Sequence, residues 1–346
     1  MIPYLLVLFL VSLWTCIEKY TFNRKAILLP SFCLIIFASI RNYTVGTDTE
    51  TYTINFVSKT DSQYFNFTSD IEYGYQFLEL IILSLTHNYF WLFFITSFFV
   101  VIFYLTTIRK LSENYILSIL IYITFGFYTF FFNGLRQGIA MSICFFALPL
   151  MLERKFFKYS LLILLSSLFH VASLIMLFFY FLVYFKAKLE YKIASVLIGS
   201  SLLSSVVITY LAQGNDRYKH YTEIADKSGG YLTLGFYFAI GIVVYLLGKT
   251  ERHNNENYRV FEVIFLCGLA FVLPVSLLGT DPSGPQRIFY FFASTVIFLL
   301  PIVLERLKSQ IFKFLFVLLA IVYFCLITSK LNNLVPYMLN PYFEVF

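Results

Sequence analysis

The sequence predicts an all-α polytopic integral membrane protein that forms a single transmembrane domain, residues 1–346. Hydrophobic residues make up 60% of the chain and charged residues 13%, and the mean hydropathy is +0.79, whereas soluble domains are roughly 45–50% apolar and about 25% charged. Apolar runs of the length needed to cross a bilayer follow one another along the chain. These runs do not alternate polar and apolar residues, as the strands of a membrane β-barrel would.

About twelve transmembrane helices are expected in order along the chain. Residues 75–86 are also apolar, but this run is short and carries Glu79, so we expect a helix on the outer surface, or one re-entrant into the membrane. Residues 159–185 are too long for one span and short for two, which predicts a broken pair that turns near His170. A GT-C-like arrangement of helices would fit this pattern. The expected spans are 1–17, 26–40, 89–108, 115–132, 138–152, 159–169, 171–185, 193–212, 231–248, 258–279, 288–304 and 311–329.

The distribution of Lys and Arg predicts the orientation. If both termini face outward, the inner segments carry about twice as many basic residues as the outer segments, as the positive-inside rule requires. The longest outer loop is then 41–88, with the interfacial helix inside it, and a second outer loop covers 213–230. Because the basic residues sit in short clusters between apolar runs, they do not predict nucleic-acid binding.

The long outer loop opens with polar residues that suggest function. Arg41 directly follows an apolar run, where it is either a helix-end anchor that snorkels to the membrane surface or part of a site. Asp48 and Glu50 form a D-x-E pair, which in some glycosyltransferases holds a metal and a diphosphate. An ordinary solvated turn explains this pair equally well.

A polar sequence interrupts two apolar runs at residues 133–138. Asn133, Arg136 and Gln137 follow the i, i+3, i+4 spacing of one helix face, and a helix start favours an anion near Arg136. Binding of lipid headgroups is the alternative explanation. Arg287 repeats this chemistry after the turn 281–286, and a guanidinium matches phosphate oxygens two at a time.

His170 is the histidine embedded in an apolar run. Such a residue either donates a structural hydrogen bond between helices or accepts a proton or ligand, since ionisable groups inside membranes usually line a pathway. The five cysteines all fall in apolar runs without a C-x-x-C pair, so we predict neither a metal site nor a disulfide framework. No cofactor is predicted, because no glycine-rich phosphate loop is present.

Four motifs in order resemble the EpsG-type polysaccharide polymerases, within the broader group of Wzy O-antigen polymerases. They cover nearly the whole chain, and in the predicted topology all four fall on the outer side. The motifs are R-x4-G-T-D-T-x2-Y at 41–52, N-G-L-R-Q-G-I-A at 133–140, F-H-x-A-S at 169–173 and R-x2-Y-F at 287–291.

This resemblance implies a bacterial inner-membrane enzyme with its active site facing the periplasm. Such a glycosyltransferase joins oligosaccharide repeat units carried on undecaprenyl diphosphate, and a chain-length regulator protein is a possible partner. A lipid-linked oligosaccharide flippase and a glycan ligase are the alternatives. The residues expected to bind the diphosphate are Arg41, Arg136 and Arg287; those expected to act in catalysis are His170, Asp48 and Arg136; and those expected to bind substrate are Asn133, Gln137, Tyr52 and Tyr290.

Overall fold

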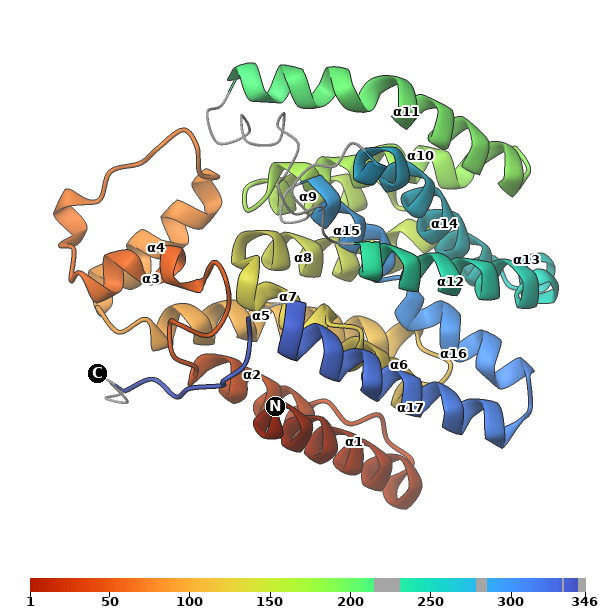
Figure 1. Cartoon of the computed structure of the whole chain (residues 1–346), viewed down its shortest axis with the longest axis horizontal. Helices are drawn as coiled ribbons and strands as arrows, with labels where there is room; N and C mark the ends of the chain where they lie inside the picture. The colour runs from red at the N-terminus through yellow and green to blue at the C-terminus, as the bar shows by residue number, and fades with distance from the viewer. Residues whose placement is uncertain (215–230, 278–284, 332, 342–346) are drawn as a thin grey trace. The chain divides into compact units, whose positions relative to one another are not determined.

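The computed structural model describes residues 1–214, 231–277, 285–331 and 333–341. These residues are helical apart from the connections between helices and one isolated antiparallel β-bridge, Arg41 with Leu339 (Figure 1). The helices form two compact units. The first comprises Met1–Leu174 and Leu307–Phe346, and the second comprises Ile175–Arg306.

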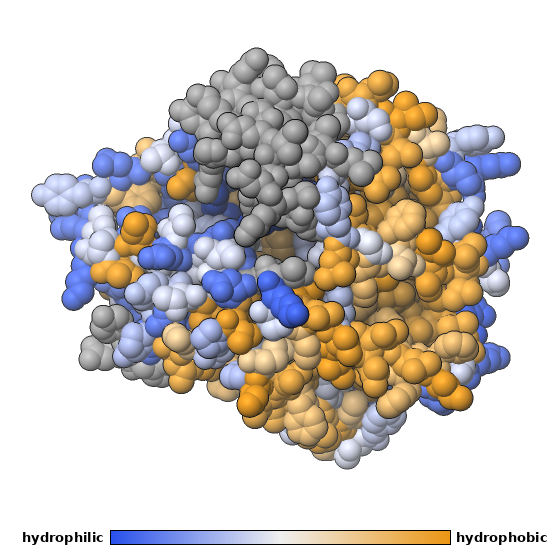
Figure 2. All heavy atoms as spheres, viewed as in Figure 1, coloured by the Kyte–Doolittle hydropathy of each residue, from blue (hydrophilic) through white to orange (hydrophobic). Residues whose placement is uncertain are grey.

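The first unit is built around α5, α6, α7 and α8. In the span formed by α6 and α7, 89% of the residues in the apolar stretch are buried, whereas the share is 28% in α1 and 28% in the span that begins with α17. The face over α1 and α17 is correspondingly hydrophobic, as expected for helices that contact lipid (Figure 2). The elements are α1 Ile2–Phe22, α2 Leu28–Ser39, α3 Thr49–Val57, η1 Ser62–Tyr64, α4 Tyr73–Leu85, α5 Phe90–Leu111, α6 Tyr115–Thr124, α7 Phe127–Asn133, α8 Leu135–Leu152, α9 Phe156–Ser167, η2 Val171–Leu174, α17 Gln310–Leu326 and η5 Ile327–Leu331.

In the second unit, α14 packs against α11, α12, α15 and α16. The span expected at 288–304 is bent by 52° between α15 and α16. At the bend, the carbonyl of Phe292 accepts from Oγ1 of Thr295 at 2.8 Å and from its backbone N–H at 3.2 Å. The elements are α10 Ile175–Tyr184, α11 Leu189–Gly214, α12 Tyr231–Leu247, α13 Lys249–Asn254, α14 Glu256–Leu277, η4 Pro285–Ile288, α15 Phe289–Ala293 and α16 Val296–Arg306. Most of the predicted outer loop 213–230, and residues 281–284 of the turn before Arg287, lie outside the described residues.

The predicted membrane class is confirmed, but the number of twelve spans is not. In the part of the chain that is described, six helices are long and apolar enough to cross a membrane, or seven if the bent pair counts as one span, and five further apolar helices are shorter. The helix α4 has 13 residues, which makes it about 20 Å long, against about 30 Å for the hydrocarbon core. Since α2 and α9, which were both predicted to span, have 12 residues each, length alone does not separate α4 from them, and the surface or re-entrant position of residues 75–86 stays a prediction.

The predicted break near His170 is also confirmed. α9 ends at Ser167, and a 3₁₀ turn begins at Val171, so His170 lies between two helical segments.

Segments that the charge pattern assigns to the inner side contact one another. Lys25 donates to the carbonyl of Arg109 at 3.0 Å, and Lys110 pairs with Glu153 at 3.0 Å.

Candidate active site

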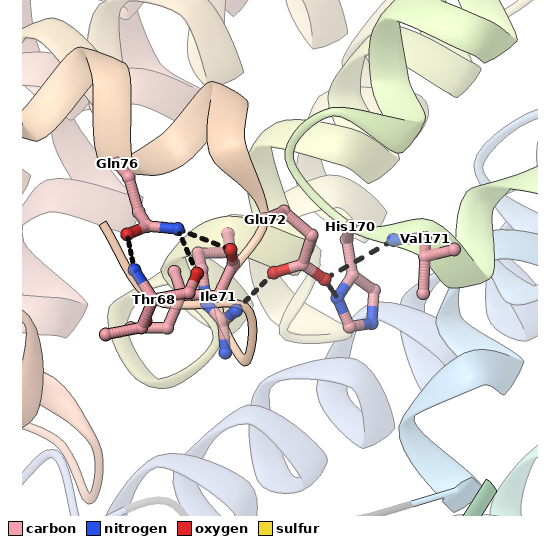
Figure 3. A network of polar contacts seen from close by, with 7 residues as sticks. Thr68, Ile71, Glu72, Gln76, His170 and Val171 are labelled. Atoms are coloured by element: carbon pink, nitrogen blue, oxygen red, sulfur yellow. Dashed lines mark hydrogen bonds and ion pairs between the residues drawn. The ribbon is translucent and has the colours of Figure 1, made fainter. Parts of the chain in front are cut away.

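The side chain of Glu72 contacts two of the predicted site residues, Arg136 and His170, and Figure 3 shows its contact with His170. Its Oε2 accepts a hydrogen bond from Nη1 of Arg136, and its Oε1 lies 3.0 Å from Nδ1 of His170. The side chains of Glu72, Arg136 and His170 are 16%, 12% and 24% exposed, so the ion pair is largely shielded from water. One carboxylate thus joins the outer loop, the first turn of α8 and the break after α9.

Glycine at position 74 allows this approach of the outer loop to α9. The backbone N–H of Gly74 donates to the carbonyl oxygen of Leu168 at 2.9 Å. A Cβ atom at position 74 would lie 2.6 Å from that oxygen, closer than real side chains come. Because Glu72 immediately precedes α4, this contact places its carboxylate beside His170, two residues after Leu168.

The environment of Glu72 keeps its carboxyl group ionised. Burial is the largest influence and raises the pKa, but the hydrogen bond with His170 and the charges of Arg136 and His170 outweigh it and lower the pKa from 4.5 to about 2. An ionised carboxylate can only accept hydrogen bonds, so Nδ1 of His170 is the donor. In the neutral imidazole that carries its proton on Nδ1, the lone pair lies on Nε2.

Tyr52, a predicted substrate-binding residue, belongs to the same cluster. Its side chain lies close enough to Arg136 to interact with the guanidinium electrostatically. Its ring lies edge-on to the buried ring of Tyr75, with centroids 5.7 Å apart. Tyr52 comes from α3 and Tyr75 from α4, so both helices of the outer loop contribute to the surroundings of Arg136.

The predicted residues Asp48 and Asn133 are brought together by a tight turn. Oδ1 of Asn133 accepts a hydrogen bond from the backbone of Thr47 at 2.9 Å, and Thr49 Oγ1 donates to the carbonyl of Phe132 at 2.9 Å. Gly46 has a φ of +114°, which favours glycine, and a Cβ there would lie 2.4 Å from Oδ1 of Asn133. The turn therefore holds Asp48 near the junction of α7 and α8.

Gln137, also predicted to bind substrate, is buried in the first turns of α8, immediately after Arg136.

Within the described ranges, no three His, Cys, Asp or Glu side chains come close enough to share a metal ion.

Arg41 is fully buried, at 0% exposure. Its guanidinium carbon lies 3.7 Å from the ring centroid of Phe93 and 4.3 Å from that of Phe132, and Nη1 donates to the carbonyl of Ala38 at 2.5 Å, in the last turn of α2. Direct contact between Arg41 and a substrate would require these rings to move apart. In the described conformation its contacts are cation–π interactions and a bond to a helix C-terminus.

The C-terminal segment 333–341 contributes to this burial. The backbone N–H of Asn42 donates to the carbonyl of Met338 at 2.8 Å, and that of Asn340 donates to Ile40 at 2.8 Å. The ring of Tyr337 stacks on Phe37 with centroids 4.4 Å apart. Residues almost 300 positions apart in the sequence therefore pair across the start of the outer loop.

Arg287 and Tyr290 belong to the second unit, where they lie in η4 and α15. The ring of Tyr290 lies 6.3 Å from that of Tyr237 in the same unit. That either residue acts together with Arg136 remains a prediction from the sequence.

Sequence reasoning did not identify Glu72, which takes the central place in this cluster. It is one of several acidic residues in a polar loop, where an acid is usually solvated. The sequence offered one signal. Glu72 lies directly before an apolar helix and on the same predicted outer side as Arg136 and His170, which each need a partner.

No curated protein and no solved structure matches the chain. The EpsG family matches it over residues 4–339, nearly its whole length. The predicted resemblance is thereby confirmed, and it supports a function of the membrane glycan polymerase type. The chain belongs to the EpsG family.

Proposed function

We propose that this protein is a polysaccharide polymerase of the Wzy type. It transfers a growing glycan from undecaprenyl diphosphate to the non-reducing end of the next lipid-linked repeat unit, at the periplasmic face of a bacterial inner membrane. EpsG family membership supports the general class. The observation that carries the finer proposal is the contact of one carboxylate, that of Glu72, with both His170 and Arg136.

In the proposed reaction His170 is the general base. A hydroxyl oxygen of the acceptor sugar attacks the anomeric carbon of the donor sugar, and its proton passes to Nε2 of His170. The bond between the anomeric carbon and the diphosphate oxygen breaks, and the lipid diphosphate leaves with the electron pair. Glu72 holds the imidazole ring through Nδ1 and stabilises the imidazolium that forms.

Arg136 is proposed to stabilise the negative charge that develops on the leaving diphosphate. A guanidinium has five N–H donors, more than its contact with Glu72 uses. Its position in the first turn of α8 adds the favourable field of a helix N-terminus. Arg287 is proposed as a second diphosphate ligand, and Asp48, Asn133 and Gln137 as groups that contact the sugars.

The outer face of α4 supports a site at the level of the lipid headgroups. Phe77, Ile81 and Leu85 recur every four residues and are 60%, 43% and 80% exposed. Such a stripe suits a helix that lies in the membrane interface. Glu72 precedes the first turn of this helix, so the cluster would lie where the diphosphate of a membrane-anchored substrate is found.

Surface-glycan profiling of a deletion strain tests the proposal. Loss of the gene should leave glycans of a single repeat unit, and the wild-type gene should restore the ladder of longer chains. Loss of a flippase would remove the single-unit band as well, because no unit would reach the outer face. An unchanged ladder in the deletion strain would contradict the proposal.

A further inference from the structure

Three aromatic rings on the outer loop form a cluster next to Glu72. The ring of Phe67 lies 5.5 Å from that of Phe65, edge-on, and 6.3 Å from that of Tyr73. Phe67 is 47% exposed and Tyr73 is 63% exposed. We call Phe65, Phe67 and Tyr73 the aromatic surface. Rings gathered in this way remain partly open to water, which is typical of a surface that binds something.

Short polar side chains surround these rings. Asn66, Thr68 and Ser69 are all exposed and lie between Phe67 and Glu72 or beside Phe67 in the sequence. The face over α3 and α4 is mostly hydrophilic, with isolated hydrophobic residues (Figure 2). These polar side chains distinguish the aromatic surface from the apolar stripe Phe77, Ile81 and Leu85 farther along α4, which suits lipid contact.

The charge of residues 59–72, which include Phe65 and Phe67, also disfavours binding to a membrane surface. Residues 59–72 contain one lysine and three acidic residues. Anionic headgroups attract basic segments and repel acidic ones. For the same reason the diphosphate of a substrate is an unfavourable ligand for this surface, which leaves an uncharged ligand with both apolar and polar faces.

A buried glutamine, Gln76, ties together the backbone between Phe67 and Glu72, through Thr68 and Ile71 (Figure 3). Nε2 of Gln76 donates to the carbonyls of Thr68 at 2.8 Å and Ile71 at 2.5 Å, and its Oε1 accepts from the N–H of Thr68 at 2.8 Å. Gln76 is 2% exposed. Its three bonds hold the chain between Phe67 and Glu72, a stretch that spans at most about 18 Å even when extended.

We propose that the aromatic surface is a saccharide subsite that binds the uncharged part of the glycan. A pyranose ring has an apolar C–H face, which packs on an aromatic ring, and a rim of hydroxyls, which the neighbouring polar side chains can bind. This subsite rests on the proposed polymerase function, because its connection to Glu72, which precedes Tyr73 in the sequence, would place a bound sugar near the proposed base.

Binding of a free oligosaccharide tests the subsite separately from catalysis. The probe is the repeat oligosaccharide released by mild acid from the strain's own lipid-linked units, which lacks lipid and diphosphate, titrated into the detergent-solubilised full-length protein. Phe67→Ala and Tyr73→Ala should each raise the Kd about tenfold, since one stacking contact is worth roughly 1.4 kcal/mol. Both residues are exposed, so neither change removes a core side chain.

Matched variants identify the cause of any loss. Tyr64→Ala is the control, because Tyr64 lies in the same loop and is 75% exposed but is not part of the aromatic surface; its Kd should stay that of the wild type. His170→Gln should also bind the oligosaccharide normally while failing to polymerise. A wild-type protein that binds the oligosaccharide but makes no polymer would therefore count against the proposed function and leave the subsite standing.

Two results would overturn the subsite. One is a wild-type Kd in both Phe67→Ala and Tyr73→Ala. The other comes from Phe67→Trp in a background with Trp14 and Trp91 replaced by phenylalanine, reconstituted in nanodiscs. Quenching of this tryptophan by brominated lipids would show that the surface lies in the membrane. The expected outcome is the opposite: brominated lipids do not quench its fluorescence, and addition of the oligosaccharide quenches the fluorescence or shifts its spectrum.

Discussion

Replacing Glu72 with glutamine keeps the size of the side chain and removes the charge that holds the proposed site together. Arg136 only donates hydrogen bonds, so the amide oxygen of the glutamine must face it. The amide NH₂ then faces Nδ1 of His170, which has to accept. The imidazole proton would move to Nε2, and the atom proposed to take the substrate proton would no longer be able to do so.

The magnitude follows from the two contacts. Each hydrogen bond to a charged group contributes about 1.5–3 kcal/mol, and the ion pair is largely shielded, with Glu72 16% exposed. Glutamine keeps both contacts only as neutral hydrogen bonds, which contribute about 0.5–1.5 kcal/mol each, so their weakening in the transition state would cost about 2–3 kcal/mol, or roughly 10²-fold in rate. The wrong tautomer of His170 adds to this loss, since neutralising the carboxylate of a serine protease triad costs about 10⁴-fold.

The assay is the length of surface glycan in the deletion strain that carries each variant at matched membrane levels. Glu72→Gln should give the single-unit band and little or no ladder. Asp61→Asn is the control, because it makes the same change of charge in the same loop at an exposed residue, and asparagine caps η1 as well as aspartate does. A normal ladder from Glu72→Gln would refute the role of Glu72 as the partner of the base.

Arg136→Lys should lower the polymerisation rate about a hundredfold or more, because a point ammonium cannot hold Glu72 and offer a second edge to a diphosphate. Equal ladders at matched levels would reduce Arg136 to a structural ion-pair partner of Glu72. Gly46→Ala should shorten the ladder without loss of the protein from the membrane, since a Cβ would lie 2.4 Å from Asn133 Oδ1 and would displace the turn that carries Asp48, and an unaffected ladder would show that the turn does not position the site. Single cysteines in a cysteine-free background should react with an impermeant maleimide in spheroplasts at positions 48 and 66, but not at 155 or 252; labelling at 155 or 252 would overturn the predicted topology. Because the pKa of Glu72 is about 2 in the folded protein against an ordinary 4.5, its contribution to stability is complete above pH 4.5 and is lost as the pH falls toward 2, so the wild type should lose stability over that range more steeply than Glu72→Gln in thermal unfolding.

The features that follow from apolar length and charge were predictable from the sequence. The break at His170 was one of these, because a run of this length fits neither one span nor two. The short helix at 75–86 was another, because Glu79 interrupts its apolar character. The position of Arg136 in the first turn of a helix also follows from local sequence, since a glycine precedes it at the end of α7.

The features that depend on contacts between distant segments were not predictable. Arg41 looks like a residue at the membrane surface, but pairing with the segment 333–341 and packing of Phe93 and Phe132 bury it completely. No local pattern in residues 333–341 indicates that pairing. Glu72 was missed for a related reason, because its importance comes from Arg136, 64 positions away, and His170, 98 positions away.

The central claim is that this chain extends a lipid-linked glycan with His170 as the base. Its most direct test is polymerisation by the purified protein in proteoliposomes, supplied only with the strain's own lipid-linked repeat units. The wild type should produce a ladder of lengthened glycans and release lipid diphosphate as each unit is added. His170→Gln, which keeps a hydrogen-bonding side chain but cannot act as a base near neutral pH, should produce neither. A ladder from His170→Gln would contradict the account, and so would the absence of extension by the folded wild type.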